Sequence, residues 1–224
     1  MINDVENLKR LYKELYSKIS ENNHNGIFPF FVQAGSKYPS SDKRCLFVGK
    51  SVNGWITNSR DVEELFDMNN DKRIVNRSDQ IIWALNRMNS PFWRVIRGVS
   101  REIIPDDDWY NYIAWSNLYK LSPCEGNPDG RLQNLQREAC IKILNEEIRI
   151  LKPNCVIFLS SSWERFYLDF IGLDIAKNSK KYWSKHQTQY QVKGDILYIQ
   201  SPHPQCKNED AHIRAISEIL KAWF

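Results

Sequence analysis

The sequence lacks a long apolar run, a paired-cysteine motif and a glycine-rich nucleotide loop. A helix that crosses a bilayer needs roughly 18 consecutive apolar residues, and no segment of the 224-residue chain approaches that. Residues 1–10 (MINDVENLKR) also lack the apolar centre of a signal peptide. We therefore expect a soluble, cytoplasmic protein that has no membrane partner.

Cysteine is sparse, and neither sign of charge is in large excess. The chain has 5 cysteines, an odd number without any CxxC pair, which argues against a disulfide framework. A net charge of +4 and a pI near 8.7 permit a nucleic-acid partner without requiring one. The absence of GxGxxG and of a Walker lysine loop counts against an unrelated α/β enzyme that uses a nucleotide.

Hydrophobic residues make up 42% of the chain, enough for a substantial core in one domain that spans residues 1–224. In residues 4–20, apolar side chains recur at helical spacing, so we expect an opening helix whose buried face packs on that domain (residues 1–22). We expect the protein to be a monomer.

Short apolar strands alternate with helical patterns in the rest of the chain. The strand candidates are residues 44–48 (RCLFV), 112–118, 155–159 (CVIFL) and 196–200 (ILYIQ). Helical patterns cover residues 78–88, 92–103, 132–151 and 210–223, with a further helix after residues 160–162. This alternation predicts an α/β fold, a three-layer α/β/α sandwich around a central, mainly parallel four-stranded sheet.

In an open parallel sheet the ligand crevice lies beyond the carboxyl ends of the strands. The loops expected there are residues 49–55, 117–127, 160–163 and 201–207. Asn117 offers an amide donor and acceptor that complement the edge of a pyrimidine, although an Asn after a strand also closes turns. His203 lies between Pro202 and Pro204, which hold the imidazole either as a stabiliser of negative charge or as a structural histidine.

Three consecutive serines follow the third strand candidate. Ser160, Ser161 and Ser162 would place hydroxyls and backbone N–H groups at a helix start, where a phosphate binds. The same serines would serve equally well as an ordinary helix cap. The sequence leaves both interpretations open.

Four short segments follow one another along the chain in an order that is typical of a known family. They are residues 47–49 (FVG), 115–117 (WSN), 150–157 (ILKPNCVI) and 203–204 (HP). This order resembles the uracil-DNA glycosylase superfamily over roughly residues 44–220. Residues 117–120 (NLYK) and the cysteine of the helix before LKP are most similar to its iron–sulfur members, and residues 90–96 (SPFWRVI) are similar to the mismatch-specific uracil and thymine glycosylases.

The resemblance implies a role for each strand end. Asn117 would hydrogen-bond a base flipped out of DNA, and His203 would stabilise the anionic base as the glycosidic bond breaks. The loop that begins Gly49-Lys50 would position water, and Trp55 or Phe92 would stack on the base, with core packing as the alternative for Phe92. Residues expected to contact DNA are Lys120, Ser160, Ser161, Ser162, Gln205 and Lys207.

The first motif departs from the family pattern. Family members carry Asp, Glu or Asn shortly after the glycine, whereas residues 49–55 read GKSVNGW and hold no carboxylate. Ser51 or Asn53 would have to position the attacking water, which predicts slower chemistry or a more labile leaving base. A changed first motif and the long segment at residues 57–89 could instead widen the pocket for a modified base.

The iron–sulfur ligand set is incomplete. Cys140 matches one ligand position and Cys124 lies near another, but the early CxxC is missing. We therefore expect no metal and no cofactor.

The function expected is that of a monofunctional DNA glycosylase, a hydrolase of N-glycosyl bonds. It would excise uracil or a modified pyrimidine, with a hypermodified cytosine of phage DNA as one candidate, which implies base excision in DNA repair or antiphage defence. The alternative is a non-catalytic DNA-binding protein of the same fold.

Overall fold

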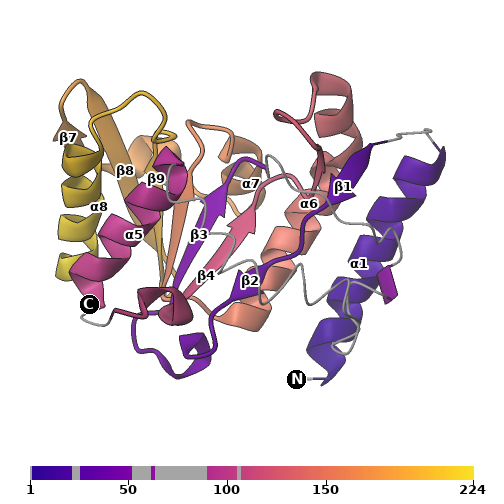
Figure 1. Cartoon of the computed structure of the whole chain (residues 1–224), viewed down its shortest axis with the longest axis horizontal. Helices are drawn as coiled ribbons and strands as arrows, with labels where there is room; N and C mark the ends of the chain where they lie inside the picture. Colours follow the sequence, from indigo (N-terminus) through magenta and orange to yellow (C-terminus); the bar gives the residue numbers. More distant parts are fainter. Residues whose placement is uncertain (1, 22–25, 52–61, 64–89, 105–106) are drawn as a thin grey trace. The chain divides into compact units, whose positions relative to one another are not determined.

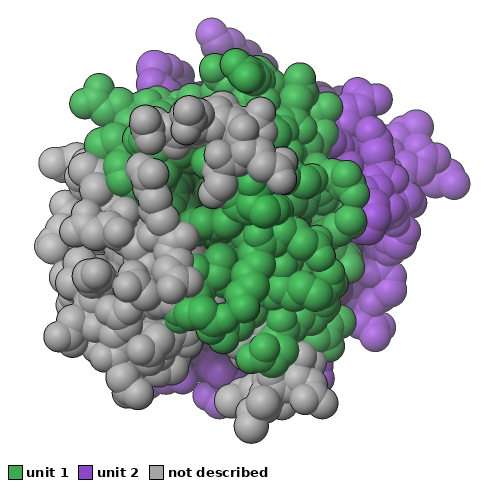
Figure 2. All heavy atoms as spheres, turned by 90° about the vertical axis from the view of Figure 1, so that its right-hand side faces the viewer, with its two compact units in different colours: residues 1–32, 50–80, 117–151 green, residues 33–49, 81–116, 152–224 purple. Residues whose placement is uncertain are grey.

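The computed structural model describes residues 2–21, 26–51, 62–63, 90–104 and 107–224. These residues group into two compact units, coloured separately in Figure 2. Unit 1 comprises Met1–Val32, Lys50–Gln80 and Asn117–Leu151, and unit 2 comprises Gln33–Gly49, Ile81–Ser116 and Lys152–Phe224. Because units interleaved in this way can belong to a single domain, the expectation of one domain stays a prediction.

Unit 1 is built on two helices, α1 (Ile2–Glu21) and α6 (Gly130–Leu151), which pack against each other. Their apolar faces bury Leu8, Leu11, Tyr12, Leu15, Leu132, Ala139 and Ile143. The predicted opening helix is thus confirmed. A two-stranded antiparallel sheet, β1 (Ile27–Pro29) with β5 (Leu121–Pro123), completes the unit and was not predicted.

Unit 2 contains a sheet of seven strands, in the order β2-β4-β3-β6-β9-β8-β7. The strands are β2 (Gln33–Ala34), β3 (Cys45–Gly49), β4 (Ile113–Asn117), β6 (Cys155–Leu159), β7 (Ser179–Trp183), β8 (His186–Lys193) and β9 (Ile196–Ser201). The last residue of β4, Asn117, is grouped with unit 1.

The centre of this sheet is parallel. Strand β6 pairs in parallel with β3 on one side and with β9 on the other, and every residue of β3 and β6 is buried, as expected for strands covered on both faces. The four predicted strands are all present. The predicted count of four is wrong, because β2 and the β7–β8 hairpin add antiparallel edges. The fold is therefore mixed α/β with a mostly parallel central sheet.

Helices α5 (Pro91–Ile103) and α8 (Glu209–Trp223) lie side by side in unit 2 (Figure 1). Arg94 Nε donates to Glu209 Oε2 at 2.8 Å near both N-termini, and Lys221 Nζ donates to Glu102 Oε2 at 2.5 Å farther along. The two helices therefore run parallel. Between these contacts, a Cβ on Gly98 would lie 2.3 Å from Ile213 Cδ1, so a larger residue at position 98 would require the Ile213 side chain to move.

The remaining elements of unit 2 are short: helix α7 (Arg165–Phe170) and three 3₁₀ turns at Tyr38–Ser40, Trp109–Tyr112 and Ile175–Lys177. The helix predicted at residues 78–88 lies outside the described residues. Among the helices that the structure describes, none combines the length and apolar character needed to cross a bilayer.

Candidate functional site

The predicted site residues fall into three groups. Gly49, Phe92, His203, Gln205, Lys207 and the serines 160–162 belong to unit 2, and Lys50, Ser51, Asn117 and Lys120 belong to unit 1. Asn53 and Trp55 lie outside the described residues. Gly49 ends the buried strand β3 as predicted.

His203 follows the carboxyl end of β9 and is fixed by two backbone hydrogen bonds. Its own N–H donates to Ser161 Oγ at 2.7 Å, and its ring Nδ1 accepts from Gln205 N at 3.3 Å. A neutral imidazole that accepts at Nδ1 carries its proton on Nε2. The loop after β9 therefore presents a histidine whose Nε2–H is a hydrogen-bond donor.

Phe92 lies beside this histidine. The two rings are nearly parallel, with an interplanar angle of 15° and centroids 6.2 Å apart. The pairing of Arg94 with Glu209 aligns the starts of α5 and α8, and these helices carry Phe92 and the loop of His203. Phe92 also meets Trp93 edge-on at 5.5 Å and is half-buried, so part of its ring contributes to packing.

The three serines have different roles. Ser160 is fully buried and its hydroxyl donates to Glu164 Oε2, so the prediction that Ser160 contacts DNA is wrong. Ser161 and Ser162 are exposed and hold the left-handed backbone conformation, with φ of 55° and 72°, a strained arrangement that is common at functional sites. Helix α7 begins only at Arg165, so the serines do not form its first turn as predicted.

A buried polar chain lies behind the end of β9. Trp183 Nε1 donates to Thr188 Oγ1 at 2.9 Å, Thr188 Oγ1 lies 2.7 Å from Ser201 Oγ, and Ser201 Oγ lies 2.7 Å from His212 Nε2. Burial, followed by the charge of Lys207, lowers the pKa of His212 to about 3, so its imidazole is neutral. This chain ties the β7–β8 hairpin and helix α8 to the residue before the His203 loop.

In unit 1, Asn117 is 1% exposed, and its Nδ2 makes no hydrogen bond to any residue that the structure describes. A buried amide donor without a partner costs roughly 1–3 kcal/mol. Such a cost is tolerated where a ligand supplies the missing acceptor. The role of Asn117 in binding a base stays a prediction.

Lys120 does not have the predicted role. Its ammonium is fully buried and pairs with Glu147 Oε2 at 2.7 Å. It also lies 5.8 Å from the ring centroid of Phe30. A buried and ion-paired lysine cannot reach a DNA phosphate, so the prediction that Lys120 contacts DNA is wrong.

Ser51 is half-buried at the start of the first loop. Its hydroxyl donates to Asn127 Oδ1 at 3.0 Å, which leaves its oxygen lone pairs to accept a hydrogen bond from water. The carbonyl of the preceding Lys50 accepts from Tyr119 N at 2.9 Å and so fixes the backbone of this loop.

The cysteine that matches a cluster-ligand position, Cys140, lies in the core. Cys140 is fully buried, accepts from Lys120 N and donates to Gln136 Oε1, and burial raises its pKa to about 12. Across the described parts of the chain, no group of three or more potential ligands gathers.

Sequence reasoning missed the residues that support the His203 loop. His212 lies on the buried face of α8 with Ala215 and Ile216, and this helical spacing was its only signal. Thr188 gave no signal, because the polar strand that carries it (HQTQYQVK) lacks the apolar alternation of a predicted strand.

No protein-family model matches the chain, and no curated protein matches its sequence.

Proposed function

We propose that this protein is a monofunctional DNA glycosylase that hydrolyses the N-glycosidic bond of a flipped-out uracil or modified pyrimidine. The observation that carries the proposal is the hydrogen bond from Gln205 N to His203 Nδ1, which directs the imidazole proton to Nε2. A neutral N–H donor of this kind suits the oxygen of a departing pyrimidine anion.

The leaving base is the centre of the proposed mechanism. As the bond between C1′ and N1 breaks, the electron pair passes to the base and negative charge spreads to its O2. The His203 Nε2–H donates to that oxygen, and the preorganised loop limits the reorganisation needed during the reaction. In unit 1, the unpartnered Nδ2 of Asn117 is an amide donor of the kind that selects the edge of a base.

Water completes the reaction at C1′. The lone pairs of Ser51 Oγ would orient the attacking water, or Asn53 would do so. Neither is a carboxylate, so the barrier depends on a good leaving base rather than on a strong general base. This argument favours pyrimidines that leave as stable anions, such as uracil. A hypermodified cytosine of phage DNA, and with it a role in antiphage defence as well as in repair, is proposed on the separate ground that the first motif differs from that of the family. The three-layer sandwich of the superfamily is part of the same proposal.

The missing carboxylate also favours a second candidate, a DNA-binding protein of this fold that does not cleave. One assay separates the two. The protein is incubated with labelled DNA that bears uracil, hydroxymethylcytosine or glucosylated hydroxymethylcytosine, and alkali-labile abasic sites are measured under single-turnover conditions.

We expect His203→Ala to slow base release by about 100-fold, the cost of losing one oxyanion donor, with an unchanged thermal midpoint. Asn117→Ala should also slow release, and it should leave the fold intact because it removes an unpartnered amide. Binding without release on every substrate would support the second candidate instead.

A further inference from the structure

A polar pocket opens beside the His203 loop, entirely within unit 2. Its volume is about 630 Å³, within the range of small-ligand sites. The wall comes from the β7–β8 hairpin and from the residues that follow β6 and β9. Ser161 and Pro202 line it, and because Ser161 also binds the backbone of His203, the pocket adjoins the proposed base site.

Uncharged hydrogen-bonding side chains dominate the wall of this pocket. Gln187, Gln189 and Gln200 line it together, and residues 189 and 200 are direct partners across β8 and β9. Each glutamine carries one acceptor and two donors on the same planar group, the pattern that also reads the edges of nucleobases. Of the two charged residues that line it, Lys185 and Glu164, Glu164 is buried and already accepts from Ser160.

Gln200 supplies an independent sign of a missing ligand. It is 8% exposed, and its Nε2 has no hydrogen-bond partner among the described residues. An amide donor buried without an acceptor is costly. An acceptor atom on a molecule bound in this pocket would satisfy it.

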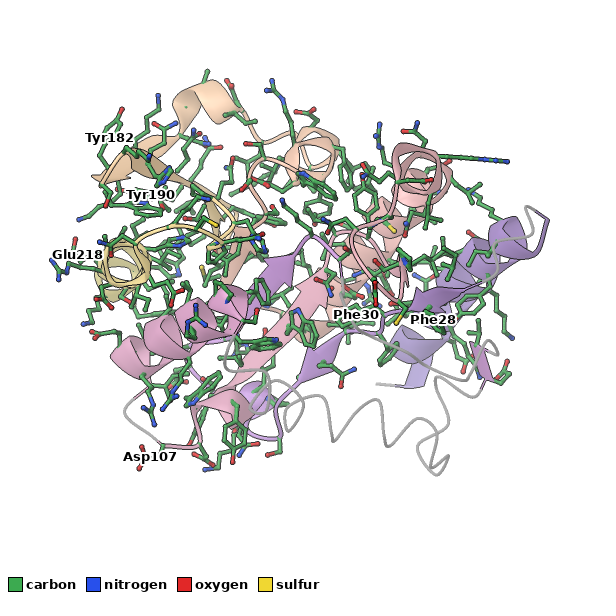
Figure 3. All side chains as sticks on the ribbon, turned by 45° about the horizontal axis from the view of Figure 1, so that its top comes forward. Phe28, Phe30, Asp107, Tyr182, Tyr190 and Glu218 are labelled. Atoms are coloured by element: carbon green, nitrogen blue, oxygen red, sulfur yellow. The ribbon has the colours of Figure 1, made fainter. Side chains whose placement is uncertain are left out.

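The rim of the pocket is aromatic and basic. Tyr182 is 72% exposed, and Figure 3 shows it standing out from the hairpin strands. Lys180 is exposed two residues earlier on β7 and so shares a face with Tyr182, while Lys185 is exposed at the hairpin turn and lines the pocket. An exposed ring between two cations suits a base stacked on tyrosine and linked to phosphates.

We propose that this pocket binds an unpaired nucleotide of single-stranded DNA next to the target base, through Gln200, Gln189 and Tyr182. The lysines favour this ligand over a neutral sugar, and the amides favour an unpaired base because pairing in a duplex covers its hydrogen-bonding edge. The inference rests on the proposed function for the identity of the neighbouring site. It adds a preference for single-stranded or locally opened DNA.

The test measures binding of the intact chain to a fluorescein-labelled 12-nucleotide single strand and to its duplex, by fluorescence anisotropy. The strand contains no uracil or modified base, so binding is measured apart from base release. We expect the single strand to bind more tightly, and Tyr182→Ala to weaken that binding at least fivefold, as loss of a stacking platform does. Phe170→Ala is the matched control, because Phe170 is also an exposed aromatic residue of unit 2 but does not line this pocket.

Gln200→Leu tests the buried amide itself. We expect weaker binding to the single strand together with an unchanged or higher thermal midpoint, because leucine removes an unsatisfied donor at similar volume. A purely structural glutamine would instead lower the midpoint. Gln191→Leu on the neighbouring strand β8 is the control, since Gln191 does not line this pocket.

Equal binding by all four variants, tighter binding to the duplex, or glucose that competes with the strand would overturn the inference. The two proposals can fail separately. Single-strand binding that depends on Tyr182 without any base release would sink the glycosylase proposal alone. Base release that requires His203 but is insensitive to Tyr182 and Gln200 would sink this inference alone.

Discussion

Both units bury polar side chains, but they satisfy them differently. In unit 1, Lys120 is paired with Glu147, and the amide of Gln136 both donates to the carbonyl and accepts from the N–H of Leu121, each at 2.9 Å. At the end of β9 in unit 2, Gln200 Nε2 and His212 Nδ1 have no partner among the described residues. The ammonium of Lys120 and the amide of Gln136 thus find their partners within unit 1, whereas the amide donor of Gln200 has none among the described residues.

This contrast separates structural polar groups from candidate functional ones. Buried groups that act only in folding are generally hydrogen-bonded, since an unmet donor lowers stability. Unmet groups beside a pocket therefore point to a ligand. Asn117 in unit 1 also carries an unmet donor and is a candidate functional residue on that ground alone, whereas Lys120, three residues later, is a structural one.

Lys120→Met should break the contrast most strongly. It leaves the carboxylate of Glu147 buried without its ammonium, so we expect the free energy of unfolding to fall by about 3–5 kcal/mol. Urea denaturation measures this loss. The double variant Lys120→Met, Glu147→Leu should recover most of it, because it removes both charges.

The exposed pair of Lys142 with Glu138 on α6 provides the control, and Lys142→Met should leave the urea midpoint almost unchanged. If Lys120→Met behaved like this control, Lys120 would not be the structural group described here, and its assignment to the DNA-contacting set would have to be reopened.

The pH dependence of stability tests the buried polar groups of unit 2, through His212. Burial lowers the pKa of His212 to about 3, against about 6.5 in an unfolded chain. Below pH 6.5 the unfolded chain therefore binds a proton that the folded protein does not. This term stabilises the fold above pH 6.5 and is lost as the pH falls toward 3, by up to about 1.4 kcal/mol for each pH unit.

Carboxylates titrate in part of the same range, so the measurement compares wild type with His212→Gln. We expect the difference between their unfolding free energies to change steeply between pH 6.5 and 5 and to stay flat between pH 7 and 8. Parallel curves over the whole range would mean that the pKa of His212 is the same in the folded and the unfolded protein.

The central strands could be predicted because burial on both faces demands continuous apolar runs such as CLFV and CVIFL. The β7–β8 hairpin could not, since one of its faces is polar and its strand β8 alternates only weakly. The same polarity builds the pocket, so the region least visible to hydrophobic patterning carries the candidate ligand groups.

For individual site residues, the sequence predicted where they lie but not what they contact. The prolines around His203 indicated a held imidazole, but its tautomer depends on the N–H of Gln205, a loop geometry that spacing does not encode. Lys120 was misassigned because sequence shows its charge and not its partner Glu147, 27 residues away.

The thiols extend the contrast with the smallest expected effect. Cys206 is exposed and Cys124 half-buried, whereas Cys45, Cys140 and Cys155 are fully buried. Burial raises the pKa of Cys140 to about 12 and that of Cys155 well above its usual value, so neither forms the reactive thiolate near neutral pH.

With a thiol reagent such as DTNB, we expect Cys206 to react first in the folded protein, and the buried three to react only after unfolding. Cys206→Ser should remove the fast phase alone. Fast labelling of Cys140 would instead show that the Lys120–Glu147 cluster opens readily and that its ion pair does not make it rigid.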